Sequence, residues 1–499
     1  MKSFLMFLLC STWRTTANLT ETVQHLDEIH VSLNKHELLS QRERLQEHEG
    51  DILKSLELSP QRQATLDRIE RETPKVVERH FRAVGDTIQE INKHTRVGDL
   101  LYQGDMVLLP HQWSDVIHTV VNNATDRKKR QAVNIDTQAT AIWKNGHVAY
   151  SFHSNTSARI RKLFIKGISA WQQSTCLTFY EDYHASERVE VIDYDDGCWS
   201  NVGNIHKVQK ISLGEGCDLI NTVMHELGHT LGFFHTQSRN DRDLYIVLVL
   251  DNIEKGEEVQ FGKESRARNE NYGIPYDYGS IMHYGSRSFS DNDEHVIVPI
   301  DKLYIETLGS PFIAFYELLM MNRLYSCLGK RIPKGCGKEL KATTKYLEFT
   351  DSVGYTGVKH ANQMEDFMMC HYWIKAPRGR KVEIRIKSFT PDNIAVDGCF
   401  LAGFEIKTQK DQALTGYRYC SSAYKNRTFI SHSNIVPIIT YSRAWKIKTT
   451  LEYRLGDSLR NGLSFCFSIT HFSLKSATAK QRMIWIMPSH HKCLVDENC

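Results

Sequence analysis

The spacing of apolar and polar residues divides the chain into three segments of different expected structure. From about residue 18 to 130, Leu and Ile recur at the intervals of amphipathic helices among many Glu, Lys, Arg, Gln and His residues. From 131 to 328 the pattern is mixed, with strand-like stretches at 148–152 and 177–180 ahead of a helical stripe. From 336 to about 472, short β-like runs dominate. We therefore predict helices first, an α+β region next and an all-β region last.

One helix of the α+β region is well outlined. Its apolar residues recur every three or four positions, at Leu219, Ile220, Val223, Met224, Leu227 and Leu231. Asp218 directly precedes this stripe and is expected to cap the helix N-terminus with its side chain. Gly232 directly follows the stripe, and we expect a positive φ there because glycine adopts that conformation at little steric cost.

Two histidines on this helix indicate a metal site. His225 and His229 are four residues apart and share one helix face, so their rings can converge on a single cation. The turn at Gly232 returns the chain and delivers His235 as a third ligand. Three protein ligands leave one position for water, which is typical of catalytic rather than structural zinc, and Glu226 is the expected general base.

Chance is the alternative origin of this pattern. With 23 histidines among 499 residues, an HExxH sequence is expected by accident in roughly a few per cent of such chains. Adding the glycine and the third histidine at fixed offsets lowers that frequency to about one in 10⁴. The complete motif therefore predicts a zinc-dependent hydrolase.

The residues around the motif resemble the astacin family of metzincin proteases. After His235 the chain reads TQSRNDRD and then Tyr245, and residues 278–284, YGSIMHY, are similar to the family's Met-turn. The resemblance implies a two-lobed catalytic domain in which Met282 lies under the metal. It also implies that Tyr284 is an additional zinc ligand at rest, and that its phenol swings away to support the oxyanion during peptide hydrolysis.

The chain departs from the family pattern directly after the third histidine. Family members usually have Glu there, and its carboxylate reaches the amino terminus of the mature enzyme. This chain has Thr236 instead. A terminal amine would therefore lose its anionic partner, so we expect this activation contact to be absent or rebuilt differently.

Several features indicate a secreted protein. Residues 1–17 are typical of a secretory signal, with Lys2 ahead of an apolar run and small residues near the end. No later stretch approaches the roughly 20 apolar residues of a membrane span, so no membrane-spanning segment is expected. Eleven of the 12 cysteines lie from Cys176 onward, as expected for disulfides formed in an oxidising compartment. Glycan acceptors would then be Asn18, Asn123, Asn155 and Asn426.

The segment 18–130 is expected to be a pro-segment. It ends in the basic run Arg127-Lys128-Lys129-Arg130, and a processing protease would cut after Arg130. Upstream, the sequence Tyr102-Gln103-Gly104-Asp105-Met106 is similar to the short FxGD motif by which astacin pro-segments block the active site. The resemblance implies that Asp105 offers a carboxylate oxygen to zinc in place of the catalytic water. The precursor would then be latent through ligand competition.

The cysteine pattern extends the family resemblance. Pairing of Cys176 with Cys327 and of Cys198 with Cys217 would follow the two astacin disulfides in a protease-like domain at 131–328. Sequence alone does not decide this connectivity.

Residues 336–472 resemble a CUB domain, which is an antiparallel β-sandwich. The resemblance implies pairs between Cys336 and Cys370 and between Cys399 and Cys420. Many CUB domains have a calcium-binding Asp where this chain has Ala402, so calcium is not expected. The tail at 473–499 is left unassigned, and the cysteines left without an expected partner are Cys466, Cys493 and Cys499.

Two classes of function remain open. The net charge of +3 is near balance and gives no indication of nucleic acid or of an acidic membrane surface as the partner. One function is a secreted zinc endopeptidase whose CUB-like domain holds extracellular proteins or matrix. The other is a binding protein built on a retired protease and acting through that domain, which Thr236 favours. We prefer the enzyme because a retired site has no physical reason to keep all of His225, Glu226, His229, His235, Met282 and Tyr284.

Overall fold

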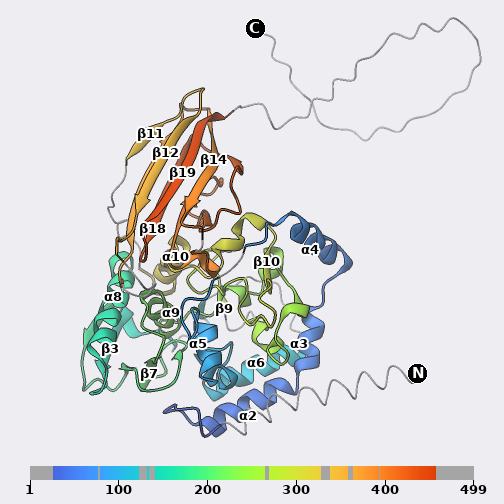
Figure 1. Cartoon of the computed structure of the whole chain (residues 1–499). Helices are drawn as coiled ribbons and strands as arrows, with labels where there is room; N and C mark the ends of the chain where they lie inside the picture. Colours follow the sequence, from blue (N-terminus) through green and yellow to red (C-terminus); the bar gives the residue numbers. More distant parts are fainter. Residues whose placement is uncertain are drawn as a thin grey trace, which may run out of the picture. The chain divides into compact units, whose positions relative to one another are not determined.

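The computed structural model describes residues 26–76, 79–122, 132–133, 141–264, 269–327, 338–357, 364–392 and 394–456. They all belong to one packing unit, and their helices and strands are drawn in Figure 1. The expected signal sequence (1–17), the basic run (127–130) and the tail (473–499) lie outside the described residues. No helix within the described ranges has both the length and the apolar character that crossing a bilayer requires.

Residues 26–122, the N-terminal segment, are mainly helical, as predicted. The α-helices described there are α2 (Lys35–Gln46), α3 (Glu49–Leu56), α4 (Pro60–Glu72), α5 (Ile88–His94) and α6 (Pro110–Asn122). Ser59 caps α4 by accepting a hydrogen bond from the backbone N–H of Arg62. Thr87 and Glu90 form a capping box at the start of α5. Local capping signals therefore set where α4 and α5 begin.

A six-stranded sheet carries the α+β region, in the strand order β1-β6-β7-β5-β3-β4. Its strands are β1 (Met106–Val107), β3 (His147–Phe152), β4 (Thr178–Glu181), β5 (Arg188–Ile192), β6 (Cys198–Asn201) and β7 (Val208–Leu213). β3 and β4 confirm the predicted strands to within one residue at each end. β1 belongs to the N-terminal segment and pairs in parallel with β6, with Met106 opposite Ser200. The N-terminal segment thus adds an edge strand to this sheet.

Helices and short strand pairs complete the α+β region. The α-helices described there are α8 (Ala158–Ser174), α9 (Ile220–Thr230) and α10 (Phe315–Leu324). Pairs outside the main sheet are β2 (Ala132–Val133) with β9 (Asn269–Glu270) and β8 (Ile246–Leu248) with β10 (Ile297–Pro299). α8 and α9 approach closely at Gly167, where an added Cβ would lie 2.6 Å from the side chain of Val223. The apolar stripe predicted for α9 is buried.

Short 3₁₀ helices connect many of these elements. Those within the described residues are η1 (Val97–Leu100), η3 (Lys144–Gly146), η4 (Thr236–Ser238), η5 (Arg242–Leu244), η6 (Leu250–Asn252), η7 (Glu258–Phe261), η8 (Lys302–Thr307) and η9 (Asp397–Cys399). Two of them lie at junctions of the fold. η4 begins directly after the third histidine of the motif, and η8 contacts the C-terminal part of the chain.

The predicted cap of α9 is wrong. Leu219 is the N-cap residue, and no side chain caps the helix. The carboxylate of Asp218 instead lies 2.7 Å from Nε of Arg159 and 3.8 Å from Nη1 of Arg82. A carboxylate between two guanidinium groups makes stronger, charge-assisted contacts than a cap to neutral N–H groups. The arginines lie far from Asp218 in the sequence, so the pattern around α9 did not reveal this competition.

The C-terminal part forms two sheets, as predicted, and we call residues 338–456 the sandwich (gold to red in Figure 1). The five-stranded sheet has the order β11 (Glu339–Lys341), β13 (Met368–Lys375), β18 (Ile435–Ser442), β15 (Ala402–Ile406), β16 (Tyr417–Tyr419). The four-stranded sheet has the order β12 (Leu347–Val353), β19 (Ile447–Gly456), β14 (Lys381–Thr390), β17 (Thr428–Ile430). Ile374 and Phe404 from the first sheet share a buried core with Ile384 and Leu451 from the second.

Disulfides join the cysteine pairs that the family resemblance implied. The bonded pairs described are Cys176–Cys327, Cys198–Cys217 and Cys399–Cys420. Cys370 is also disulfide-bonded, and its expected partner Cys336 lies outside the described residues. Cys466, Cys493 and Cys499 lie outside them as well.

Two buried carboxylates join the α+β region to the sandwich. Glu306, in η8, accepts a hydrogen bond from the backbone N–H of Cys420 at 2.8 Å. From the sandwich side, Asp397 accepts hydrogen bonds from the hydroxyl of Ser286 at 2.7 Å and from the backbone N–H of Arg287 at 2.8 Å. A buried carboxylate without such donors is costly, so these bonds fix the sandwich against the α+β region.

The junction makes stability depend on pH through Glu306. Burial raises the pKa of Glu306 to about 7 from a usual value of 4.5. The folded protein therefore holds this proton more tightly than the unfolded chain, and the stabilisation present below about pH 4.5 is lost as the pH rises through about 7. Glu306→Gln does not titrate, yet it can accept from Cys420 and donate to the Ser421 hydroxyl, which now donates to Glu306 at 2.8 Å.

We expect the free energy of unfolding of the wild type, relative to Glu306→Gln, to fall by roughly 3 kcal/mol between about pH 4 and pH 8. Urea denaturation of both proteins across this range measures the difference. A difference that stays constant with pH would contradict the raised pKa.

Candidate metal centre

Three imidazoles gather at one point of the α+β region. α9 presents His225 and His229 one turn apart, and Gly232 leaves the helix with the predicted positive φ, at +106°. The chain then turns back and places His235 at the start of η4. Nε2 of His225 and Nε2 of His235 lie 3.3 Å apart. The ligand atoms of the three histidines and Asp105 all lie within 4.8 Å of one another.

Two of the rings are oriented by backbone carbonyls of the α+β region. Nδ1 of His225 lies 2.7 Å from the carbonyl oxygen of Ile281. Nδ1 of His229 lies 2.8 Å from the carbonyl oxygen of Phe233. A carbonyl oxygen can only accept, so each Nδ1 carries a proton. In the neutral tautomer the lone pair then lies on Nε2, the nitrogen that faces the cluster.

The third ring is oriented in the same way by the N-terminal segment. Nδ1 of His235 lies 3.0 Å from the side-chain oxygen of Gln103. Burial lowers the pKa of His229 and holds the pKa of His235 at about 3, so these rings are neutral. Lone pairs that face one another and a carboxylate cannot satisfy each other. The chemistry of this donor set therefore fits a divalent cation such as zinc.

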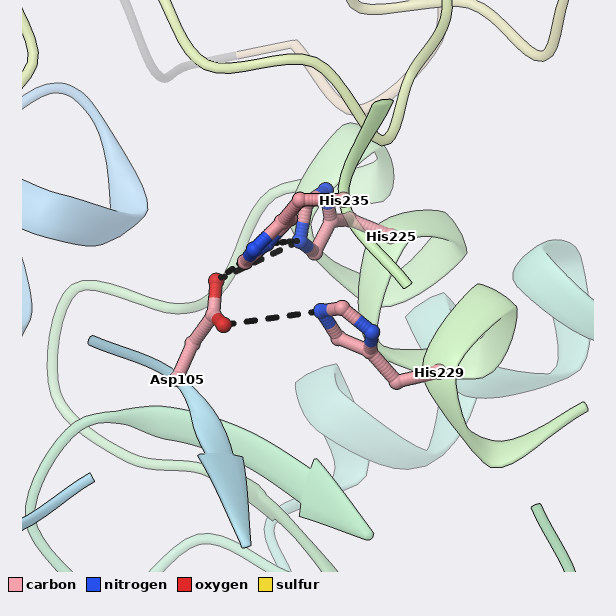
Figure 2. Close-up of side chains that lie close together, drawn as sticks. All are labelled: Asp105, His225, His229 and His235. Carbon is pink, nitrogen blue, oxygen red and sulfur yellow. Dashed lines mark hydrogen bonds and ion pairs between the residues drawn. The ribbon is translucent and has the colours of Figure 1, made fainter. Parts of the chain in front are cut away.

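Asp105 closes the cluster from the N-terminal segment, and Figure 2 shows its carboxylate facing all three rings. One carboxylate oxygen, Oδ2, lies 3.3 Å from Nε2 of His225 and 3.2 Å from Nε2 of His235. The other, Oδ1, lies 3.5 Å from Nε2 of His229. Gly104 precedes Asp105 with φ +77°, and β1 follows it directly. The pairing of β1 with β6 therefore fixes how deeply the carboxylate reaches.

Glu226 is fully buried next to the first histidine. Neither of its carboxylate oxygens has a hydrogen-bond partner among the described residues. Burial, and after it the neighbouring charge of Asp105, raises the pKa of Glu226 well above its usual range. Buried polar groups are normally paired, and an unpaired carboxylate beside a ligand cluster is typical of a group that takes up and releases a proton.

Tyr284 and Met282 lie beside the cluster. The ring of Tyr284 packs against His235 with centroids 4.6 Å apart, and its hydroxyl donates to the backbone carbonyl of Gln103. The phenol is therefore engaged by the N-terminal segment. Met282 is fully buried, and an added Cβ at Gly228 of α9 would lie 2.5 Å from its sulfur. Only glycine allows this approach of the thioether to the helix.

A buried carboxylate lies close to Thr236. The Thr236 hydroxyl lies 2.7 Å from the hydroxyl of Ser280, which in turn donates to Glu317 at 2.6 Å. Glu317 also accepts from the backbone N–H of Met282 at 3.2 Å. The carboxylate thus lies one hydroxyl group beyond the threonine. This network ties η4 to the turn that carries Met282 and to α10.

Sequence reasoning did not single out the contacts around the Asp105 motif. The hydroxyl of Tyr102 donates to Glu264 at 2.9 Å, across 162 residues of sequence. Gln103 is fully buried and contacts His235 across 132 residues. Neither contact carries a periodicity or a metal-ligand spacing. Their position next to Asp105 is the one sequence signal that could have suggested them.

Comparison with known proteins links this site to one family. Residues 135–326 match the family model of Astacin, a family of peptidases. Zinc metalloproteinase nas-31 of Caenorhabditis elegans is 40% identical over 409 residues, which cover 74% of this chain and 66% of that protein. Zinc metalloproteinase nas-29 of the same organism is 30% identical over 418 residues, which cover 74% of this chain and 78% of that protein.

Two further matches differ in how much of each chain they cover. The chain spans 60% of zinc metalloproteinase nas-32 of Caenorhabditis elegans, at 30% identity over 404 residues and with 74% of this chain covered. Among solved structures, high choriolytic enzyme 1, a hatching enzyme zinc-protease from Oryzias latipes, is 29% identical. That match has a TM-score of 0.36 and covers 38% of this chain and 97% of the other.

The cluster predicts the metal content of the purified protein. We expect one transition-metal ion per chain, and His229→Ala should reduce this to less than about one tenth after dialysis because it removes a ligand from a three-histidine set. His184→Ala removes an exposed histidine and should leave the metal content unchanged. Elemental analysis by mass spectrometry measures both. Equal metal in the two variants would contradict the site.

Proposed function

Because the chain belongs to the astacin family of peptidases, we propose that it is a secreted zinc endopeptidase. It is made as a latent precursor and hydrolyses peptide bonds in extracellular proteins or matrix. The relatives nas-31 and nas-29 are zinc metalloproteinases by name, which supports zinc as the cofactor. The described disulfides, formed outside reducing compartments, support secretion.

One observation carries the proposal. Three imidazoles, each with its proton on the outward Nδ1, direct their lone pairs at one point beside a buried carboxylate that has no partner among the described residues. A structural zinc site usually has four protein ligands, so no coordination position is open. Here the fourth group, Asp105, belongs to the N-terminal segment, so removal of that segment opens the site.

The residues divide the chemistry of hydrolysis among them. His225, His229 and His235 would hold zinc, which when bound supplies a Lewis acid that polarises a peptide carbonyl and acidifies water. Glu226 takes the proton of the attacking water and returns it to the leaving amine. Tyr284, once released from the carbonyl of Gln103, donates its phenolic proton in a hydrogen bond to the developing oxyanion.

Latency is the role that we assign to the N-terminal segment. Asp105 takes the side of the cluster from which water and substrate would approach, and Gln103 engages the phenol of Tyr284. Cleavage after Arg130 by a processing protease would separate this segment from the mature chain beginning at Gln131. Both the blocking carboxylate and the phenol contact would then be lost in one step.

The sandwich is the part that we expect to hold the substrate protein. Its two antiparallel sheets support the resemblance to a CUB domain. Ala402 lies fully buried in β15, so no carboxylate is available there for calcium. The contacts of Glu306 and Asp397 keep the sandwich fixed next to the protease part, as suits a domain that presents a bound protein for cleavage.

The mature enzyme should lose its activity when Glu226 is replaced. After cleavage behind Arg130, Glu226→Gln should lower kcat on casein or a peptide library by about 10²- to 10⁴-fold because proton transfer is removed, while zinc content is kept. Glu215→Gln, an exposed carboxylate of the same region, is the matched control and should have no effect. A chelator should abolish the activity of the processed wild type.

Turnover that resists the chelator and is the same in Glu226→Gln and wild type would overturn the assignment. Absence of any turnover in the processed wild type would favour instead the retired protease that binds through its sandwich.

Asp105 provides a separate test of latency. In a precursor whose basic run 127–130 is replaced by alanines, so that it cannot be processed there, Asp105→Ala should give measurable hydrolysis because the competing carboxylate is gone. Asp115→Ala, which changes an exposed residue of the same segment, should stay silent. Peptide hydrolysis by the uncut chain, checked for length by gel electrophoresis, measures both. If Asp105→Ala stays as silent as its control, the carboxylate does not block the site.

A further inference from the structure

We propose that Gln103 is a positioning residue for His235, so that the N-terminal segment orients one ligand of the metal as well as blocking it. This inference rests on the proposed zinc site and assigns a second role to the segment. It follows from the surroundings of one side-chain amide.

The side-chain amide of Gln103 makes hydrogen bonds through both its oxygen and its nitrogen, and the residue is fully buried. Its oxygen lies 3.0 Å from Nδ1 of His235 and accepts from the hydroxyl of Ser238 at 2.7 Å. Its nitrogen donates to the carbonyl oxygen of Gly262 at 3.3 Å and to the hydroxyl of Tyr102 at 3.2 Å. The side chain is therefore held at both ends.

The Gly262 contact fixes which end of the amide faces the histidine. A backbone carbonyl can only accept, so the nitrogen of Gln103 must face Gly262 and the oxygen must face His235. An acceptor at this place keeps the proton of His235 on Nδ1 and leaves Nε2 free for the metal.

The three histidines differ in where this support comes from. His225 and His229 donate to the carbonyls of Ile281 and Phe233, which remain in the chain after cleavage. His235 donates to Gln103, which leaves with the N-terminal segment. Activation would thus remove the acceptor of one ligand and leave those of the other two in place.

The backbone indicates that the position of Gln103 is specified. Its φ is +49°, a left-handed conformation that glutamine adopts at some cost. The same residue offers its backbone carbonyl to Tyr284 and its side chain to His235. Because both its backbone and its side chain are held, Gln103 is suited to orient the side chains that it contacts.

A competing explanation is that Gln103 matters because it places Asp105, two residues later. The two roles separate in a double-mutant cycle. If Gln103 acts on His235 directly, its effect on zinc binding persists when the Asp105 carboxylate is absent. If it acts through Asp105, the effect disappears there.

The test measures zinc dissociation constants of the full-length precursor by competition with a chromophoric chelator. All variants carry Glu226→Gln, so that none digests itself. Gln103→Met keeps the length of the side chain but removes the carbonyl oxygen, and Gln103→Glu keeps an oxygen toward His235. We expect Gln103→Met to weaken zinc binding by about 10- to 100-fold and Gln103→Glu to stay within about threefold of the parent.

Gln112→Met is the matched control. Gln112 is a buried glutamine of the same segment that accepts from the N–H of Leu109 at 2.8 Å and donates to the carbonyl of Val202 at 3.4 Å. Neither of these partners is a metal-binding histidine, so the zinc constant of the variant should equal that of the parent. Thermal unfolding of the metal-free Gln103→Met and Gln112→Met proteins should show similar losses, which separates ligand orientation from general destabilisation.

The cycle is completed with Asp105→Ala. Gln103→Met should still weaken zinc binding about 10-fold or more in that background. No effect there, or no effect of Gln103→Met in the parent, would overturn the inference while leaving the endopeptidase proposal intact. A parent precursor that binds no zinc would instead overturn the proposed function.

Discussion

The arrangement depends on one constraint, namely that three imidazoles turn their Nε2 atoms toward a single place. Each ring is held there by a hydrogen bond on its opposite nitrogen, to Ile281, Phe233 or Gln103. Acceptors that face one another repel unless a cation lies between them, so the fold must force them together. Three features hold the rings in place because each fixes the backbone from which a ring projects. They are α9, the turn at Gly232 and the tight approach of Met282 to Gly228.

The N-terminal segment contacts the same three histidines through Asp105 and Gln103. β1 pairs with β6 of the six-stranded sheet. That pairing places Asp105 where its two carboxylate oxygens face all three rings. Gln103, two residues earlier, faces His235 and Tyr284. A few residues therefore contact the ligands, the phenol and the sheet at once. The proposed latency and the proposed orientation of His235 therefore both depend on one short stretch of backbone.

Hydrogen bonds of two buried carboxylates, Asp397 and Glu306, join the sandwich to the α+β region. Asp397 accepts from Ser286 and Arg287, which follow Tyr284 closely in the chain. Glu306 performs the reciprocal role toward Cys420. Because each carboxylate would be costly to bury alone, separation of the two parts is opposed by both. A domain expected to bind protein thus shares hydrogen bonds with the loop that leads away from the candidate site.

The sequence by itself determined the features that depend on short spacings. The period of α9, the positive φ at Gly232 and the strands β3 and β4 follow from side-chain patterns that act within a few residues. Only the tertiary structure decided the rest. Asp218 pairs with Arg159 instead of capping α9, Thr236 lies one hydroxyl from Glu317, and Gln103 meets His235, all across gaps that carry no periodic signal. Such pairings depend on which distant segments the fold brings together. For the buried Thr236 and Gln103, burial makes any available donor or acceptor valuable wherever it lies in the chain.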